Sequence, residues 1–226
     1  MMQYLLPFLA VVAGVLLVII FKNKKPKYTK LLLSFSGAFL LALTLFDLLP
    51  EVYQHLEAKQ TGLFIMLGIL FQILLEFFSK GAEHGHVHIH EHKHNTDFPW
   101  VLFISLCIHS FLEGFPIHQH NDMVYGVLIH KIPIAALITT YLMQSQFTKN
   151  QIIAFLITFA LMTPMGTLVS NTVPFVGNYL FFINAIVIGI FFHISTVILF
   201  ESNENHRFNL SKLIVIALGI LVAYLI

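Results

Sequence analysis

The sequence contains eight runs of apolar residues, each close to the length that crosses a lipid bilayer. A transmembrane helix needs about 20 consecutive apolar residues. The runs cover residues 3–21, 30–50, 62–79, 98–117, 123–144, 151–171, 177–200 and 211–226. Only 10% of the residues are charged and 58% are hydrophobic, whereas a soluble domain has about 25% charged residues. We therefore expect an all-α polytopic membrane protein with eight transmembrane helices, forming one domain over residues 1–226.

The basic residues indicate how these helices are oriented, because lysine and arginine gather on the cytoplasmic side of a membrane protein. Ten of the twelve basic residues fall on one side of the expected bundle. Five of them, from Lys22 to Lys30, follow the first run. No basic region precedes that run, which argues against a cleaved signal peptide. Both termini are therefore expected outside, and the long loop at residues 80–97 in the cytoplasm.

Ionisable residues inside the apolar runs are the first candidates for function, because a charged group is costly in a bilayer. His109 and Glu113 lie four residues apart in the fourth run and would share one helix face, with Ser110 beside them. His130 lies in the fifth run, and both histidines fall about 10 to 14 Å below the expected outer surface. Imidazole and carboxylate groups suit zinc. We therefore expect these residues to bind one metal ion, with the serine or a water as fourth ligand.

Four short motifs accompany these candidates, and their order along the chain resembles that of the Zrt/Irt-like (ZIP) divalent metal transporters. The motifs are Leu48-Leu49-Pro50-Glu51, His109-x-x-x-Glu113-Gly114, His130-x-x-Pro133 and Pro164-x-Gly166. The resemblance covers essentially the whole chain, including the eight spans and the histidine-rich loop between spans three and four. It implies an importer of zinc, with iron, manganese and cadmium as alternative cargoes, and no enzymatic activity.

Lys131 departs from the pattern of many family members, which carry a glutamate at this position. The segment from His130 to Ala135 resembles a recognised His-Lys-x-Pro-x-Ala subset of the family. An ammonium group here would supply the positive charge of a second metal ion and pair with Glu113 or another acid. The alternative is a lysine that faces a water-filled cavity without a specific partner. The first interpretation predicts a single metal ion at the core site.

Further metal-binding candidates lie on either side of the core site. Asp47 is expected near the outer mouth, where negative groups attract cations, and its alternative role is to hold a neighbouring helix. His193 in the seventh run is an expected exit ligand toward the cytoplasm, or else a hydrogen-bonded packing residue. Glu76 and Glu201 are further candidates on that inner side.

Six histidines at alternate positions mark the loop at residues 80–97. They are His84, His86, His88, His90, His92 and His94. A histidine tract of this kind binds divalent metal ions through exposed imidazoles. We expect the loop to receive or sense cytoplasmic metal, and a passive linker is the alternative.

Two other function classes use similar ligands. An intramembrane zinc hydrolase would need a general base, but the chain has no His-Glu-x-x-His or Gly-x-Ser-x-Gly motif. An exporter of the cation-diffusion type would have six spans and a soluble C-terminal domain.

The sequence has no basic patch interleaved with aromatic residues, so it does not suggest a nucleic-acid partner. The expected partners are membrane lipid and divalent metal ions, a homodimer is left open, and the expected location is a bacterial inner (plasma) membrane.

Overall fold

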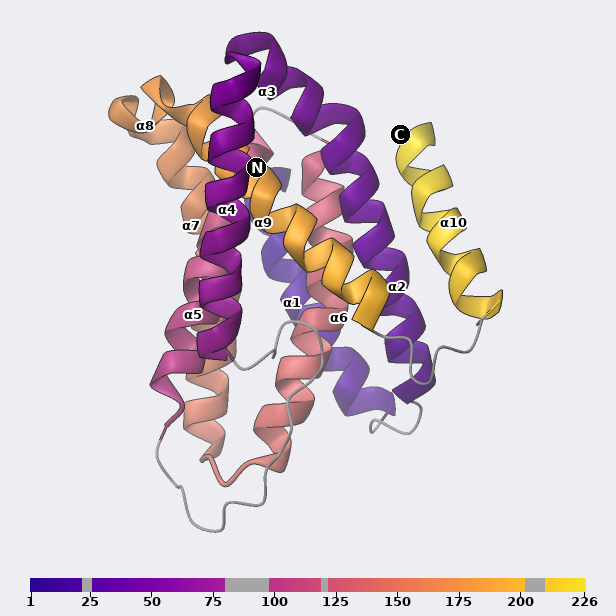
Figure 1. Ribbon diagram of the computed structural model, residues 1–226. Coiled ribbons are helices and arrows are strands. Elements are labelled where there is room, and N and C mark those ends of the chain that lie inside the picture. Colours follow the sequence, from indigo (N-terminus) through magenta and orange to yellow (C-terminus); the bar gives the residue numbers. More distant parts are fainter. Residues whose placement is uncertain (22–25, 80–97, 119–121, 202–209) are drawn as a thin grey trace.

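The computed structural model describes residues 1–21, 26–79, 98–118, 122–201 and 210–226. All the regular elements among these residues are helices (Figure 1). The six loop histidines, from His84 to His94, lie outside the described residues. The longer helices are α1 (Met2–Phe21), α2 (Pro26–Leu43), α4 (Ala58–Ser79), α5 (Trp100–Leu112), α6 (Met123–Gln144), α7 (Lys149–Thr172), α9 (Leu180–Glu201) and α10 (Leu210–Leu225).

Six described helical segments are long and apolar enough to cross a membrane, so the chain is an integral membrane protein. The other two expected spans form shorter apolar helices, α5 and α10. The expectation of one helix over residues 98–117 is wrong at its end, because α5 stops at Leu112. Gly114 follows in a turn, and Pro116 begins the 3-10 helix η3 (Pro116–His118). The run at 177–200 likewise becomes helix α9 only at Leu180, after the short helix α8 (Pro174–Asn178).

The second expected span contains a π-helical turn, η1 (Thr44–Leu48), between α2 and α3 (Leu49–His55). Pro50, which has no amide proton, stands at the start of α3 directly after this turn. The helical segment nevertheless continues from Thr29 to His55. A π turn accommodates an extra residue and is frequent at functional sites, and here it contains Asp47.

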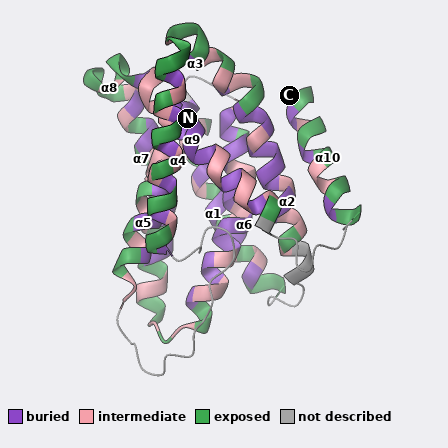
Figure 2. Ribbon diagram, viewed as in Figure 1, coloured by how far each residue is buried: buried purple, intermediate pink, exposed green. Residues whose placement is uncertain are grey.

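The long helices among the described residues pack in two groups of four. In one group α9 contacts α2 and α4, while α10 contacts α2; in the other, α1, α5 and α6 each contact α7, and α1 also contacts α6. Contacts of α2 with α6 and of α4 with α5 join the groups. Of the six candidate spans, α6 has the largest buried share, and exposed residues cover the outward faces of α4 and α10 (Figure 2). The interior therefore centres on α6.

The closest backbone contacts made by glycines join one pair of helices in each group. A Cβ atom on Gly166 of α7 would overlap the carbonyl oxygen of Phe111, and one on Gly114 would overlap that of Thr163. In the other group, Gly68 of α4 and Gly189 of α9 are packed in the same way against backbone atoms of the opposite helix. Small residues permit this close approach in membrane helices. The α5·α7 and α4·α9 crossings are therefore fixed by the backbone itself.

Candidate metal centre

Glu113 is the residue directly after α5, at the point where the helix stops. The amide of Gly114 donates to the carbonyl oxygen of Phe111 at 3.1 Å, a bond only three residues back that tightens the last turn. Pro116 has no amide proton with which to continue α5. The Glu113 carboxylate therefore lies at the end of the helix, one turn beyond His109.

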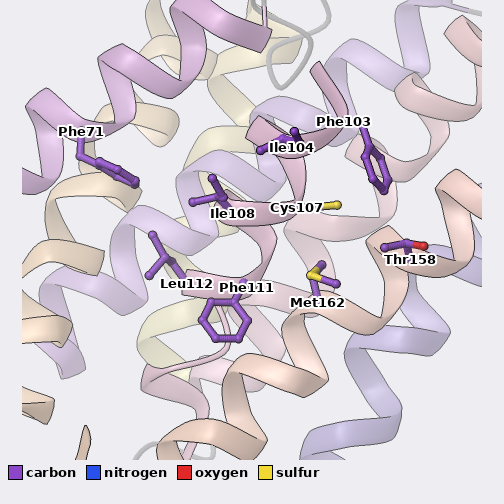
Figure 3. Close-up of a pocket in the computed structure, with 9 residues that line it drawn as sticks. All are labelled: Phe71, Phe103, Ile104, Cys107, Ile108, Phe111, Leu112, Thr158 and Met162. Atoms are coloured by element: carbon purple, nitrogen blue, oxygen red, sulfur yellow. The ribbon is translucent and has the colours of Figure 1, made fainter. Parts of the chain in front are cut away.

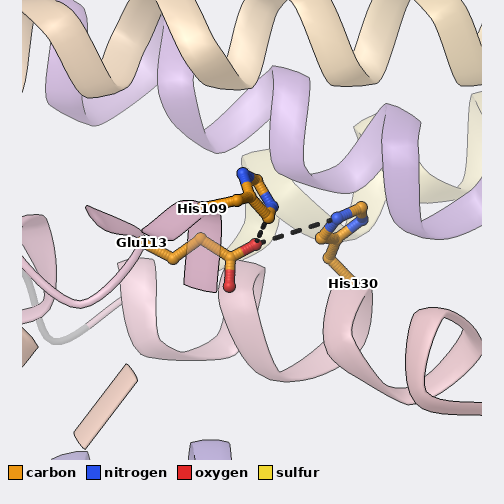
Figure 4. Close-up of side chains that lie close together, drawn as sticks. All are labelled: His109, Glu113 and His130. Atoms are coloured by element: carbon orange, nitrogen blue, oxygen red, sulfur yellow. Dashed lines mark ion pairs between the residues drawn. The ribbon is translucent and has the colours of Figure 1, made fainter. Parts of the chain in front are cut away.

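His109, Glu113 and His130 form a buried cluster (Figure 4). Oε1 of Glu113 lies 2.9 Å from Nε2 of His109 and 3.9 Å from Nε2 of His130. One potential ligand atom from each residue lies within 4.8 Å of the other two. Zinc bonds to nitrogen and oxygen are about 2.0 to 2.2 Å long, so a single ion placed among these three atoms can reach all of them after small side-chain movements.

Lys131 holds the other oxygen of the same carboxylate. Its Nζ lies 2.6 Å from Oε2 of Glu113 and donates to Oγ of Ser110 at 2.8 Å. The ammonium group also lies 4.8 Å from the centre of the Phe159 ring, and the Lys131 side chain is only 2% exposed. A buried ammonium needs such partners. The two carboxylate oxygens of Glu113 thus have different partners: Oε1 faces the imidazoles and Oε2 contacts the ammonium.

Ser110 contacts Lys131 and α7. Its hydroxyl accepts the hydrogen bond from Lys131 and lies 3.1 Å from Oγ1 of Thr163 and 3.3 Å from the carbonyl oxygen of Phe159. A serine hydroxyl has one proton to donate and two lone pairs, and these contacts use the proton and one lone pair. The structure therefore presents Ser110 as a partner of the ammonium, and its role as a fourth ligand stays a prediction.

Two threonines of α7, which no sequence motif marks, contact the end of α5. Oγ1 of Thr163 donates to the carbonyl oxygen of Ser110 at 2.8 Å, and Oγ1 of Thr167 donates to that of Gly114 at 2.9 Å. Threonines in helices usually bond a carbonyl of their own helix, so composition gave no sign of these contacts. The one available signal was their position, since they flank the Pro164-x-Gly166 motif.

The remaining expected ligands lie outside this cluster. Asp47 is half-buried in the π turn η1. His193 of α9 is paired with Glu76 of α4, their Nε2 and Oε2 atoms being 2.5 Å apart, and the two side chains are 15% and 25% exposed. His193 also lines a pocket of about 400 Å³, together with apolar residues of α2, α4 and α9. The sequence suggested both residues of this pair separately but not their contact.

A second pocket, of about 410 Å³, opens between α4, α5 and α7 (Figure 3). Its lining is mostly apolar, with side chains such as Phe71 and Phe111, and polar or sulfur atoms come only from Cys107, Thr158 and Met162. It contains no carboxylate or imidazole, and a single thiol is too few ligands for a zinc site. The buried cluster, rather than this larger space, has the chemistry of a metal site.

The matching family agrees with this chemistry. A family model described as ZIP zinc transporter matches residues 79–226, which include α5, α6 and all three residues of the cluster. No curated protein matches the chain. The family match extends over more than half of the sequence. The chain therefore belongs to the ZIP zinc transporter family, whose members transport divalent metal ions.

Proposed function

We propose that this protein imports zinc through the cluster formed by His109, Glu113 and His130. One observation carries the proposal: two imidazoles and a carboxylate are buried together among apolar helices. Ionisable groups are energetically costly in such surroundings, so their presence marks a functional site. The three side chains would bind the ion, and Ser110 or a water would be the fourth ligand. Iron, manganese and cadmium are alternative cargoes, because the same ligand types bind them.

In the proposed route, the ion enters near Asp47, binds the cluster and leaves toward His193 and the histidine loop. The route assumes eight membrane crossings with both termini outside, in a bacterial inner membrane. The ends marked N and C lie toward the same end of the bundle in Figure 1, which supports an even number of crossings. A homodimer is not needed for the site, since one chain supplies all three ligands.

Lys131 is proposed to take the place of a second metal ion, because its ammonium would supply the positive charge at a position where many family members carry a glutamate. Its contact with Oε2 of Glu113 supports this role. Two divalent cations close together repel each other strongly unless several carboxylates are shared between them. In the described cluster Glu113 is the only carboxylate, so an ammonium and one metal ion match the available negative charge better.

Zinc uptake into proteoliposomes tests the proposal. Replacement His130→Ala removes one buried candidate ligand and should lower uptake at least about tenfold, because even the loss of a residue that only orients a metal ligand costs roughly 10- to 100-fold. Joint replacement of the six loop histidines by serine is the matched control and should change uptake only modestly. Vesicles of both orientations establish the direction of transport. Wild-type uptake by His130→Ala would rule out the cluster as the transport site.

A further inference from the structure

We propose that Thr163 and Thr167 of α7 are positioning residues that fix Glu113 for metal binding by capping the broken end of α5. The inference rests on the proposed function, because it takes the cluster of His109, Glu113 and His130 as the metal site. It adds two residues from a helix that supplies no ligand to that cluster.

The backbone at the end of α5 explains why these hydroxyls are needed. In a continuous helix the carbonyl of Ser110 would accept from the amide four residues later, which is that of Gly114. That amide donates to Phe111 instead. A buried carbonyl without a partner is destabilising, and the hydroxyl of Thr163 fills the place at Ser110. The hydroxyl of Thr167 does the same for the carbonyl of Gly114, which lies beyond the end of the helix.

The two capped carbonyls bracket Glu113 in the sequence. Ser110 is three residues before it and Gly114 is the next residue. The threonines are four residues apart, so one face of α7 presents both hydroxyls to α5. Between them, Gly166 has no side chain and lets the carbonyl of Phe111 approach its backbone. The turn that carries the carboxylate thus contacts α7 at successive points, and both threonines, Ser110 and Gly114 are buried.

A series of polar side-chain contacts also connects Thr163 to the carboxylate of Glu113. Its Oγ1 lies 3.1 Å from Oγ of Ser110, which accepts from Nζ of Lys131, which in turn contacts Oε2 of Glu113. One hydroxyl therefore contacts both the backbone of Ser110, three residues before Glu113, and the side chain that accepts from the Lys131 ammonium. Because Oε1 is 2.9 Å from one imidazole and 3.9 Å from the other, a small displacement of this turn changes the three-atom geometry that the ion must meet.

The test measures the KM and the maximal rate of zinc uptake by the full-length chain in proteoliposomes. Thr163→Val keeps the shape of the side chain but removes the hydroxyl. We expect the KM for zinc to rise about three- to tenfold, the range that loss of one hydrogen bond supports, with little change in the maximal rate. Thr163→Ser restores a hydroxyl and should return the KM close to the wild-type value.

Thr172→Val is the matched control, because Thr172 is exposed on the same helix and its hydroxyl donates to Leu168 within α7. It should leave the KM unchanged. Thr167→Val removes the hydroxyl that donates to the Gly114 carbonyl. It keeps the inference testable if Thr163→Val fails to insert into the membrane. A wild-type KM in both valine variants, or equal losses in Thr163→Val and Thr163→Ser, would overturn the inference. Full uptake by His130→Ala in the same assay would instead reject the proposed function.

Discussion

Two histidine–glutamate contacts in this protein differ in how completely the protein surrounds them. At Glu113 the carboxylate is fully enclosed and contacts His109 through one oxygen and Lys131 through the other. At Glu76 the carboxylate is a quarter exposed and contacts His193. A buried carboxylate must be compensated by the protein, whereas a partly exposed one is also stabilised by solvent. The Glu113 contacts are therefore held in place by the surrounding protein, whereas the Glu76–His193 contact can separate at a smaller energetic cost.

The two contacts also belong to different helix groups. The enclosed cluster is carried by α5 and α6, while the Glu76–His193 pair joins α4 to α9. An ion that leaves the cluster for the pair must therefore pass from one group to the other. The comparison predicts large losses of stability from substitutions that leave a charge buried at the cluster. It predicts small losses from substitutions at the Glu76–His193 pair.

The largest effect is expected from Glu113→Gln. The substitution leaves the ammonium of Lys131 buried without a counter-charge, and removing one partner of a buried ion pair typically destabilises a protein by about 3 to 5 kcal/mol. The free energy of unfolding in detergent, measured by denaturant titration, should fall by this amount. The double variant Glu113→Gln with Lys131→Met should recover much of the loss. A stability equal to that of the wild type would show that the two charges are not coupled.

The sequence contained enough information for the cluster itself. The spacing of His109 and Glu113 placed them one turn apart, and the depth of His130 in the next run placed it at the same level. Their apolar surroundings followed from hydropathy alone, because so few charged residues interrupt the runs. The structure brings these three residues together.

What the sequence did not reveal depends on how helices that are distant in the chain align. The contact of Glu76 with His193 follows from the register of α4 against α9, which Gly68 and Gly189 set by backbone contact. The bond from Thr163 to the Ser110 carbonyl exists only because α5 stops early. Gly114 and Pro116 follow the early end of α5, but hydropathy continues past them and suggested a longer helix.

A second, intermediate effect is expected for Lys131→Glu, which would turn the enclosed cluster into a site with two carboxylates. If Lys131 replaces a metal ion, this variant should bind two zinc ions at the core where the parent binds one. Elemental analysis can count them, with the six loop histidines replaced by serine in both proteins so that loop-bound zinc is not included. Two core ions in the parent with Lys131 intact would refute the substitution role.

The smallest effect is expected for Glu76→Gln at the partly exposed pair. A partly exposed ion pair or hydrogen bond contributes about 1 kcal/mol, so the free energy of unfolding in detergent should fall by about this amount. Glutamine keeps the length of the side chain and can still accept a hydrogen bond from His193. A loss of unfolding free energy as large as that of Glu113→Gln would show that the two contacts do not differ in this way.

The contacts of Glu113 with two imidazoles and one ammonium also determine the formal charge that the protein brings to the cluster. The charges of the carboxylate and Lys131 cancel, and imidazoles that bind a metal ion are neutral, so the protein contributes a sum of zero. A bound divalent cation then raises the total to two positive charges inside a medium of low dielectric constant, which disfavours long occupancy. Storage sites counter this with additional carboxylates around the ion. If the described cluster binds the transported ion as proposed, its single carboxylate, which also contacts Lys131, favours brief residence and release.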